Sequence, residues 1–342
     1  MKMARNQRIF YACQAVAIVP TLGATPANNH VVKGVQSVGM TSTFTLEQVF
    51  ELGQLEIYEN VEEVADIEVT IEKVIDGENL MFRLASNNLC ATNLVAAVKN
   101  RCDVYVAIYD DATNNATGTA RNVCYNSGMY ISSISYNYSV DGNATESITL
   151  VGNDRFWNTT TAGVIHQTPA TRFANITATG FNTDTPVSGV VRRANVDLEN
   201  STVPAVVAAN GGDDLTGLAG NGGNYHVQSI AISADFGQEA IQELGRFGPY
   251  NRYATFPVEV TCEFEVIATS GDLISVSGNA PNLTDNTILI KDTAGTVLDL
   301  GTKNKLTSVS YSGGDTGGGN STITYSFSNY NSLLVQGGGA VT

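Results

Sequence analysis

The chain has 342 residues and a formal net charge of −15 at pH 7, with 43% hydrophobic and 15% charged residues. Its length allows two or three domains with buried cores, and its abundant Gly, Thr, Ser and Asn favour a mainly β protein over a helical one. An acidic surface excludes tight nucleic-acid binding, because phosphate binding requires Lys and Arg. It is compatible with a passage that nucleic acid crosses without adhering, or with solubility alone.

Residues 1–34 begin with basic residues that precede the apolar run 9–19. This order is typical of a signal peptide. Tyr11 and Gln14 interrupt the run, however, and no small-residue cleavage motif follows at the usual distance. We therefore favour an N-terminal extended arm or edge strand. No apolar run approaches the ~20 residues of a membrane-spanning helix, so no membrane partner is expected.

One stretch of the chain occurs twice without a gap, at residues 35–53 and again at 227–245. The Val-Gln-Ser start, a Phe, two Glu and a Leu-Gly end coincide, and Tyr58 matches Tyr250. Self-similarity at a fixed offset indicates a repeated structural unit. We therefore predict two tandem copies of one β-rich unit, at 35–153 and 227–332.

A short helix is predicted over 46–52, with a counterpart in the second copy. Thr45 is suited to cap its N-terminus, Gln48 has the spacing of a capping box, and Gly53 suits the left-handed position after the last turn. A two-turn helix is unstable alone, so it must lie on the sheet of its own unit.

Strands are predicted where apolar and polar residues alternate, a period of two that is typical of half-buried strands. One such strand covers 67–72 and its counterpart covers 258–266. Two hairpins close the copies, 130–136 with 143–150 and 305–311 with 320–325. Another strand is expected at 103–109, followed by a polar turn at 110–115 that lacks the full spacing of a calcium loop.

Residues 154–226 separate the two copies and are rich in Gly and Asn, so we expect a connector or a small inserted region. Residues 333–342 end in a glycine run and are expected to form a flexible tail. The acidic segment 54–66 matches a basic and aromatic segment, 246–253, in the second copy. These complementary segments are expected to meet across subunits or across copies, unless each simply covers its own sheet.

Eleven residues of these segments are candidates for subunit or ring contacts. Paired carboxylates on the predicted helices could suggest acid–base chemistry, but no His, Ser or Cys accompanies them, so we favour solvated or ion-paired roles. The candidates are Glu47, Glu51, Tyr58, Glu59, Glu62, Glu63, Glu239, Glu243, Arg246, Tyr250 and Arg252.

Signatures of catalysis and of metal binding are missing from the sequence. His30, His166 and His226 lack metal-ligand spacing, and no phosphate-binding or dinucleotide-binding loop occurs. The five cysteines contain no C-x-x-C pair, which argues against a disulfide framework or a zinc site. Cys262 is expected in the core. We therefore predict a non-enzymatic protein without cofactor or metal.

Three phrases carry a resemblance to a known family: FELGQL at 50–55, IEVTIEK at 67–73 and ELGRFGPY at 243–250. They resemble the tail tube (major tail) proteins of tailed bacteriophages. The resemblance implies a β-sandwich or half-barrel unit with one short flanking α-helix, whose inner strands join an inter-subunit β-barrel around a channel for DNA.

Because most members have one unit and form sixfold rings, two units per chain imply a homotrimeric ring with pseudo-sixfold symmetry, or alternatively a homohexamer. Stacked rings, passing DNA that is not bound specifically, and other tail proteins such as sheath, terminator or baseplate are the implied partners. The implied location is the virion tail, assembled in the host cytoplasm.

Two alternatives come from other classes. A secreted surface-layer or adhesin-type protein would explain the N-terminal apolar run and the richness in Thr and Asn. A carbohydrate-binding or hydrolytic virion component would have to place its site around Trp157 and the 154–226 region, which shows no aromatic or carboxylate cluster.

Overall fold

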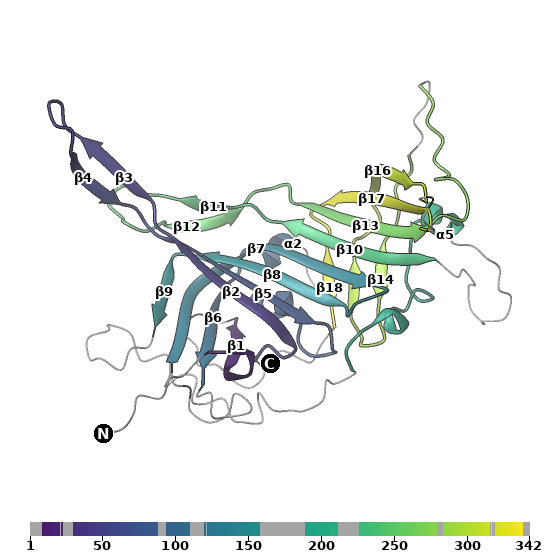
Figure 1. The fold of residues 1–342 in the computed structure, drawn as a ribbon, viewed down its shortest axis with the longest axis horizontal. Helices are drawn as coiled ribbons and strands as arrows, with labels where there is room; N and C mark the ends of the chain where they lie inside the picture. The colour runs from purple at the N-terminus through teal and green to yellow at the C-terminus, as the bar shows by residue number, and fades with distance from the viewer. Residues whose placement is uncertain are drawn as a thin grey trace.

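One antiparallel sheet runs through the molecule and takes strands from both ends of the chain (Figure 1). The computed structural model describes residues 9–20, 22, 30–87, 94–109, 120, 122–157, 189–210, 226–278, 283–314, 316 and 319–337. Along the central path the strands follow in the order β16, β17, β13, β10, β7, β8, β5, β2. Their bounds are Lys305–Ser312, Thr322–Tyr330, Glu259–Ile267, Val227–Asp235, Asn122–Ser139, Thr145–Gly152, Asp66–Val74 and Val35–Thr43. The predicted mainly β fold is confirmed.

Further strands extend or flank this sheet. Strands β1 (Gln14–Val19), β6 (Arg101–Ile108) and β9 (Asp154–Trp157) continue it from β7, and β6 covers the strand predicted at 103–109. A separate three-stranded sheet and two isolated hairpins make up the rest of the sheet structure in the described part of the chain. Their strands are β14 (Leu289–Lys291), β15 (Val297–Asp299) and β18 (Leu334–Gln336) in the small sheet, with β3 (Leu46–Phe50), β4 (Ile57–Glu62), β11 (Gln238–Ile241) and β12 (Asn251–Ala254) in the hairpins.

The helical segments of the described residues are short. They are η1 (Tyr11–Cys13), α1 (Met81–Ala85), α2 (Leu94–Ala97), η4 (Arg193–Asn195) and α5 (Ala205–Asn210). Among the described residues, no helix is long and apolar enough to span a membrane.

The central strands have one buried face and one polar face, as their alternating sequences predict. In β5 the side chains of Ile67, Val69 and Ile71 are buried, and in β13 those of Val260 and Cys262 are buried. The two predicted hairpins are also confirmed, since β7 pairs with β8 and β16 with β17. Cys262 lies in the core as expected.

The two halves of the central path have the same strand order and the same irregularities. Strands β2, β5, β8 and β7 in the first half correspond to β10, β13, β17 and β16 in the second. A register shift lies between Val35 and Ser37, and another between Val227 and Ser229.

A second pair of register shifts lies between Ile131 and Ser133 of β7 and between Leu306 and Ser308 of β16. Bulges are specific local features of a ladder, so they fix how the halves align. Positions matched in this way are called equivalent below.

Side-chain contacts repeat at equivalent positions as well. In each half a Ser of the first strand donates to a Glu of the second, and a Gln at the bulge donates to a carbonyl that precedes the strand. The contacts are Ser37 to Glu72 (3.5 Å) and Ser229 to Glu265 (3.2 Å), and Gln36 to Gly34 (3.1 Å) and Gln228 to His226 (3.3 Å).

The halves differ in what covers their buried face. In the first half, α1, α2 and β1 contribute to the core that includes β5 and β8. In the second half, the small sheet takes this place, with Ile290, Leu298 and Val335 fully buried. The halves join where β7 pairs with β10 over seven residues from Ser133 to Ser139.

The helix predicted over 46–52 is wrong, and so is its counterpart in the second copy. Residues 46–50 form strand β3, which pairs with β4, and residues 238–241 form β11, which pairs with β12. Gly53 does adopt a positive φ of 97°, but at the hairpin turn rather than at a helix end. The same turn chemistry serves both structures, so the local signals did not distinguish them.

The expectation of an extended arm or edge strand near the N-terminus is confirmed as a strand, whereas the expectation for residues 333–342 needs correction. The apolar run forms β1, which pairs with β6 along all six of its residues. The expectation of a flexible tail at 333–342 is wrong for its first residues, because β18 pairs with β15 and buries Val335. Residues 338–342 lie outside the described part.

Candidate functional site

The exposed face of the central path is polar and acidic. Ladder partners place Ser and Thr side chains in rows across neighbouring strands, for example Thr261, Ser233, Ser135 and Ser147 in one row. Carboxylates from three strands point from the same face. They are Asp66, Glu68 and Glu72 on β5, Asp235 on β10, and Glu259, Glu263 and Glu265 on β13.

Positive charge is nearly absent from this face. Within these eight strands, all of which the structure describes, the only basic side chain on it is Lys305 at the β16 edge, which forms an ion pair with Asp285 at 3.2 Å. Lys73 of β5 points the other way and is fully buried. The face therefore repels phosphate at distances up to about the Debye length of 10 Å at 0.1 M salt, and it offers little to bind it.

The eleven predicted contact residues all lie in or beside the two isolated hairpins. Glu47, Glu51, Tyr58, Glu59, Glu62 and Glu63 belong to β3–β4 and its flanks, and Glu239, Glu243, Arg246, Tyr250 and Arg252 to β11–β12 and its flanks. The hairpins are equivalent, because Leu46 faces Glu62 as Gln238 faces Ala254. Figure 1 shows β3–β4 extending away from the body, whereas β11–β12 lies close to it.

Hairpin β11–β12 is docked on the first half. Arg252 forms an ion pair with Asp66 at 2.5 Å and also donates to Asn153 at 3.2 Å. The Gln238 amide donates to the carbonyl of Ile131 at 2.8 Å. The acidic and basic segments therefore meet within one chain at the Arg252–Asp66 pair.

Two more of the predicted residues interact locally. Arg246 lies 3.9 Å from the Glu243 carboxylate and stacks over the Tyr250 ring, with 5.7 Å between guanidinium carbon and ring centroid. Both partners of the ion pair are about half exposed, so this pair adds little stability.

Hairpin β3–β4 has no such contact with the body among the residues that the structure describes, and it is exposed along both strands. It carries large apolar side chains, with Phe44 70%, Phe50 61% and Tyr58 62% exposed. Leu52 and Leu55 at its turn are fully exposed. Contiguous exposed apolar side chains mark an interaction surface.

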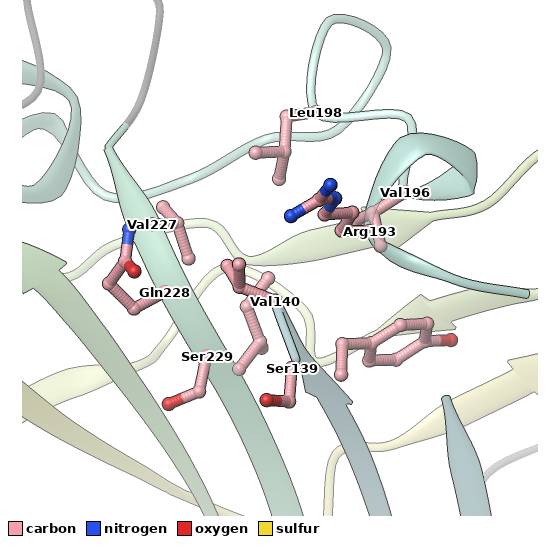
Figure 2. Close-up of a pocket in the computed structure, with 10 residues that line it drawn as sticks. Ser139, Val140, Arg193, Val196, Leu198, Val227, Gln228 and Ser229 are labelled. Atoms are coloured by element: carbon pink, nitrogen blue, oxygen red, sulfur yellow. The ribbon is translucent and has the colours of Figure 1, made fainter. Parts of the chain in front are cut away.

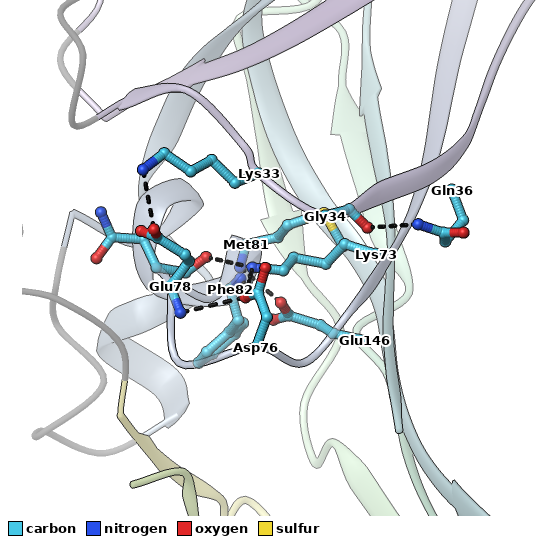
Figure 3. Close-up of polar contacts among 10 residues, drawn as sticks. Lys33, Gly34, Gln36, Lys73, Asp76, Glu78, Met81, Phe82 and Glu146 are labelled. Carbon is cyan, nitrogen blue, oxygen red and sulfur yellow. Dashed lines mark hydrogen bonds and ion pairs between the residues drawn. The ribbon is translucent and has the colours of Figure 1, made fainter. Parts of the chain in front are cut away.

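A buried charged cluster lies under the first half (Figure 3). Glu146 of β8 accepts hydrogen bonds from the backbone N–H groups of Met81 (2.7 Å) and Phe82 (3.0 Å) and from the Tyr136 hydroxyl (3.0 Å). Glu146, which belongs to strand β8, therefore caps the N-terminus of helix α1. Burial raises the pKa of Glu146 above its ordinary value, and the Lys73 ammonium opposes this shift.

Lys73 itself contacts Asp76 at 3.3 Å and the carbonyl of Asn79 at 3.0 Å. This cluster has no open face for a substrate, since Lys73, Asp76 and Glu146 are all buried. Its role is to fix the turn after β5 and the start of α1. Sequence patterns do not predict this cluster, because Glu146 lies 65 positions from Met81.

A small pocket lies at one end of the β7–β10 junction (Figure 2). Val140, Val196, Leu198 and Val227 give it an apolar lining, and Arg193 lies at its side. Ser139, Gln228 and Ser229 add polar groups to the lining, and we assign the pocket no ligand.

Other predicted features lie apart from these surfaces. Cys102 and Cys124 of β6 and β7 are not ladder partners, and the four described cysteines are free and buried. Among the described residues, no cluster of His, Cys, Asp and Glu could hold a metal ion. Trp157 ends β9 and is 39% exposed. The polar turn at 110–115, Cys90 and His166 lie outside the described residues.

Comparison with known proteins supports the resemblance in the first half of the chain. Residues 23–151 match the family model of the Phi812 tail tube protein. This range includes β2, hairpin β3–β4, β5 and most of β8, and it covers less than half of the chain. The predicted resemblance is therefore confirmed as a similarity of this range to the Phi812 tail tube family. No curated protein matches the chain.

Solved structures similar to part of the chain include a tube terminating cap and a component of an extracellular contractile injection system. The anti-feeding prophage cap (AFP tube terminating cap) is 17% identical over 46% of this chain and 96% of its own, with a TM-score of 0.34. The PVC sheath/tube terminator in the extended state is 15% identical over 46% of this chain and 100% of its own, also with a TM-score of 0.34. At these TM-scores neither similarity supports a functional argument.

Proposed function

We propose that the chain is a structural subunit of a phage-type tail tube and not an enzyme. The observation that carries the proposal is the acidic face of a single sheet whose first half matches the tail tube family. We further propose that the two halves are copies of one unit, since they share strand order, bulges and side-chain contacts.

In the proposed assembly, chains associate into rings and the rings stack. Two units per chain favour a homotrimeric ring with pseudo-sixfold symmetry over a homohexamer. The acidic sheet face would line the channel, where carboxylates repel the phosphates of passing DNA and so prevent adhesion. Sheath, terminator and baseplate proteins are the proposed partners, and the virion tail, assembled in the host cytoplasm, is the proposed location.

Electron microscopy of the purified assembly tests this proposal. Threefold rings or tubes with a pseudo-sixfold channel are the expected result. Rings of six whole chains would retain the tube and reject the trimer. A flat two-dimensional lattice would reject the tube and favour the surface-layer alternative.

The channel lining has its own test. Glu68→Lys and Glu263→Lys place cations on the sheet face, and we expect them to slow DNA delivery, with recovery at higher salt. Glu199→Lys makes the same charge change at an exposed site of the connector and serves as the control. Unchanged delivery by assembled tubes of both lining variants would count against an acidic channel.

A further inference from the structure

The central path of the sheet ends in two open strands, β2 at one end and β16 at the other. Each is paired on one side only among the described residues. Open strand edges present unpaired N–H and C=O groups, which other strands can satisfy. We propose that β16 of one chain pairs with β2 of a second copy in the register of the internal β7–β10 junction. This inference rests on the proposed function.

The internal junction supplies the geometry, because β7 is equivalent to β16 and β10 is equivalent to β2. In the junction Ser135 lies opposite Ser233 and Ile134 opposite Ala234. Replacing each residue by its equivalent gives the pairs across the two chains. The expected pairs are Thr43 with Ser308, Ser42 with Val309, Thr41 with Ser310 and Met40 with Tyr311.

Burial at equivalent positions shows what the missing neighbour would cover. Phe236 follows β10 and is fully buried, whereas its equivalent Phe44 follows β2 and is 70% exposed. The Phe236 N–H donates to the carbonyl of Ser132 at the β7 bulge, 2.8 Å away. The equivalent of Ser132 is Thr307 at the β16 bulge. A second copy would therefore give the Phe44 N–H an acceptor and cover its ring.

Strand β16 also exposes side chains whose equivalents on β7 are buried. Tyr136 on β7 is fully buried, and its equivalent Tyr311 on β16 is 55% exposed. Ile134 is buried, and its equivalent Val309 is half-buried. Both edges thus expose apolar side chains at the positions that the internal junction buries, which favours a second copy of this chain as the occupant.

Charge at the hairpin supports the same register independently. In the junction the hydroxyl of Tyr130 contacts the side chain of Asn251 on β12. Their equivalents are Lys305 on β16 and Glu59 on β4. The predicted contact between chains is therefore an ion pair of opposite charges. In the single chain Lys305 pairs with Asp285, and both are about half exposed, so little is lost when this partner is exchanged.

Cysteine cross-linking tests the register. Thr41 and Ser310 are exposed and would form a pair without mutual backbone hydrogen bonds, whose Cα separation of about 4.5 Å suits a disulfide. We expect oxidised assemblies of the Thr41→Cys/Ser310→Cys variant to give disulfide-linked oligomers on non-reducing gels. The series should stop at the number of chains per ring, three in the proposed trimer.

The control variant, Thr43→Cys/Ser312→Cys, uses the same strands and the same exposed face but is four residues out of register. We expect its cross-linking yield to be at least about tenfold lower, because the two Cα atoms lie beyond disulfide range. Equal yields would overturn the register. Assemblies without any cross-link would overturn the edge pairing but leave the tube proposal standing. Chains that stay monomeric at every concentration would overturn both.

The ion pair is tested by charge exchange. Glu59→Lys and Lys305→Glu should each weaken assembly about fivefold to tenfold, and the double variant should restore it, because opposite charges then face each other again. Glu199→Lys is the control and should assemble normally. Failure of the double variant to recover, with both single variants folded by circular dichroism, would overturn the Glu59–Lys305 contact.

Discussion

The two hairpins of this protein have equivalent positions but different environments. Hairpin β11–β12 lies on the first half of the sheet and is held by Arg252 and Gln238, whereas β3–β4 extends into solvent with Phe44 and Phe50 exposed. In the proposed assembly, hairpin β3–β4 would lie on a neighbouring chain as β11–β12 lies on the first half. The difference in exposure therefore concerns the surface beside each hairpin and not the strand pairing within it, which is equivalent in both.

The buried faces of the two halves also differ, because different elements pack against them. At the position of the buried Glu146, the second half has the fully buried Ile323, and at that of Lys73 it has Val266. The first half needs the carboxylate because α1 begins there with unpaired N–H groups. The second half has a small sheet instead. The exposed polar faces of the two halves share the Ser–Glu contacts, whereas the layers that pack on their buried faces differ.

The greatest contrast is expected between Phe236→Ala and Phe44→Ala. Phe236 is fully buried and lies 6.5 Å from the ring of Phe82, so its loss should lower the free energy of unfolding by about 3–5 kcal/mol. Phe44→Ala should change it by less than about 0.5 kcal/mol and weaken assembly instead. Denaturant unfolding and sedimentation measure the two effects. Equal destabilisation would show that the two positions do not differ.

A smaller loss is expected at the helix cap that only the first half has. Glu146→Gln replaces one acceptor oxygen by a donor that faces a backbone N–H, which should cost about 1–3 kcal/mol in the free energy of unfolding. Ile323→Val changes the equivalent position by one methyl group and should cost about 0.5–1.5 kcal/mol. Denaturant titrations of both variants measure these values, and a neutral Glu146→Gln would contradict the capping role.

The pH dependence of stability follows from the same group. Burial raises the pKa of Glu146 above 4.5, so between 4.5 and the raised value the folded state holds a proton that the unfolded state has lost. This contribution to the free energy of unfolding is present below pH 4.5 and is lost as pH rises through the folded-state pKa. The Gln variant should lack this decrease. Parallel pH curves for wild type and variant would refute it.

Arg252→Ala should destabilise the docked hairpin by about 1 kcal/mol. The effect is modest because Asp66 is 68% exposed, although the Arg252 side chain is only 9% exposed. Its equivalent in the free hairpin is Asn60, and Asn60→Ala should leave the stability of the single chain unchanged. Hydrogen exchange of the β11–β12 amides measures the docking. Unchanged protection in Arg252→Ala would show that the other contacts hold the hairpin.

The smallest effects are expected at the repeated Ser–Glu contacts. Glu72→Gln and Glu265→Gln remove equivalent carboxylates that accept from Ser37 and Ser229. Each should shift the free energy of unfolding by less than about 0.5 kcal/mol, with the same sign and the same dependence on salt. Thermal unfolding at two ionic strengths measures both. Opposite signs would indicate that the two faces have different electrostatic surroundings.

Much of the sheet could be predicted from the sequence, because alternation is a local signal. It predicts the strands at 67–72 and 258–266. It also predicts the hairpin of 130–136 with 143–150 and that of 305–311 with 320–325. The helix at 46–52 was predicted wrongly because Leu46, Val49 and Phe50 also fit a helical stripe. In the structure these side chains are exposed, so no packing within the chain decided between helix and strand.

The contacts that dock hairpin β11–β12 and cap helix α1 could not be predicted from local alternation. Arg252 and Asp66 are 186 positions apart, and Glu146 lies 65 positions from the Met81 amide that it caps. The sequence predicted the charge contrast between the two segments but not the partners. Pairing of β18 with β15 was missed because a three-residue strand has no detectable period.

In the proposed ring, the different backing of the two halves has a consequence for the proteins that would surround it. Helix α1 and its capping glutamate lie behind the first half, and the small sheet β14–β15–β18 lies behind the second. A ring of whole chains would alternate these two backings around its outside. In the proposed trimeric ring, a partner bound to the outside would therefore meet threefold symmetry, whereas a polymer inside the channel would meet pseudo-sixfold symmetry.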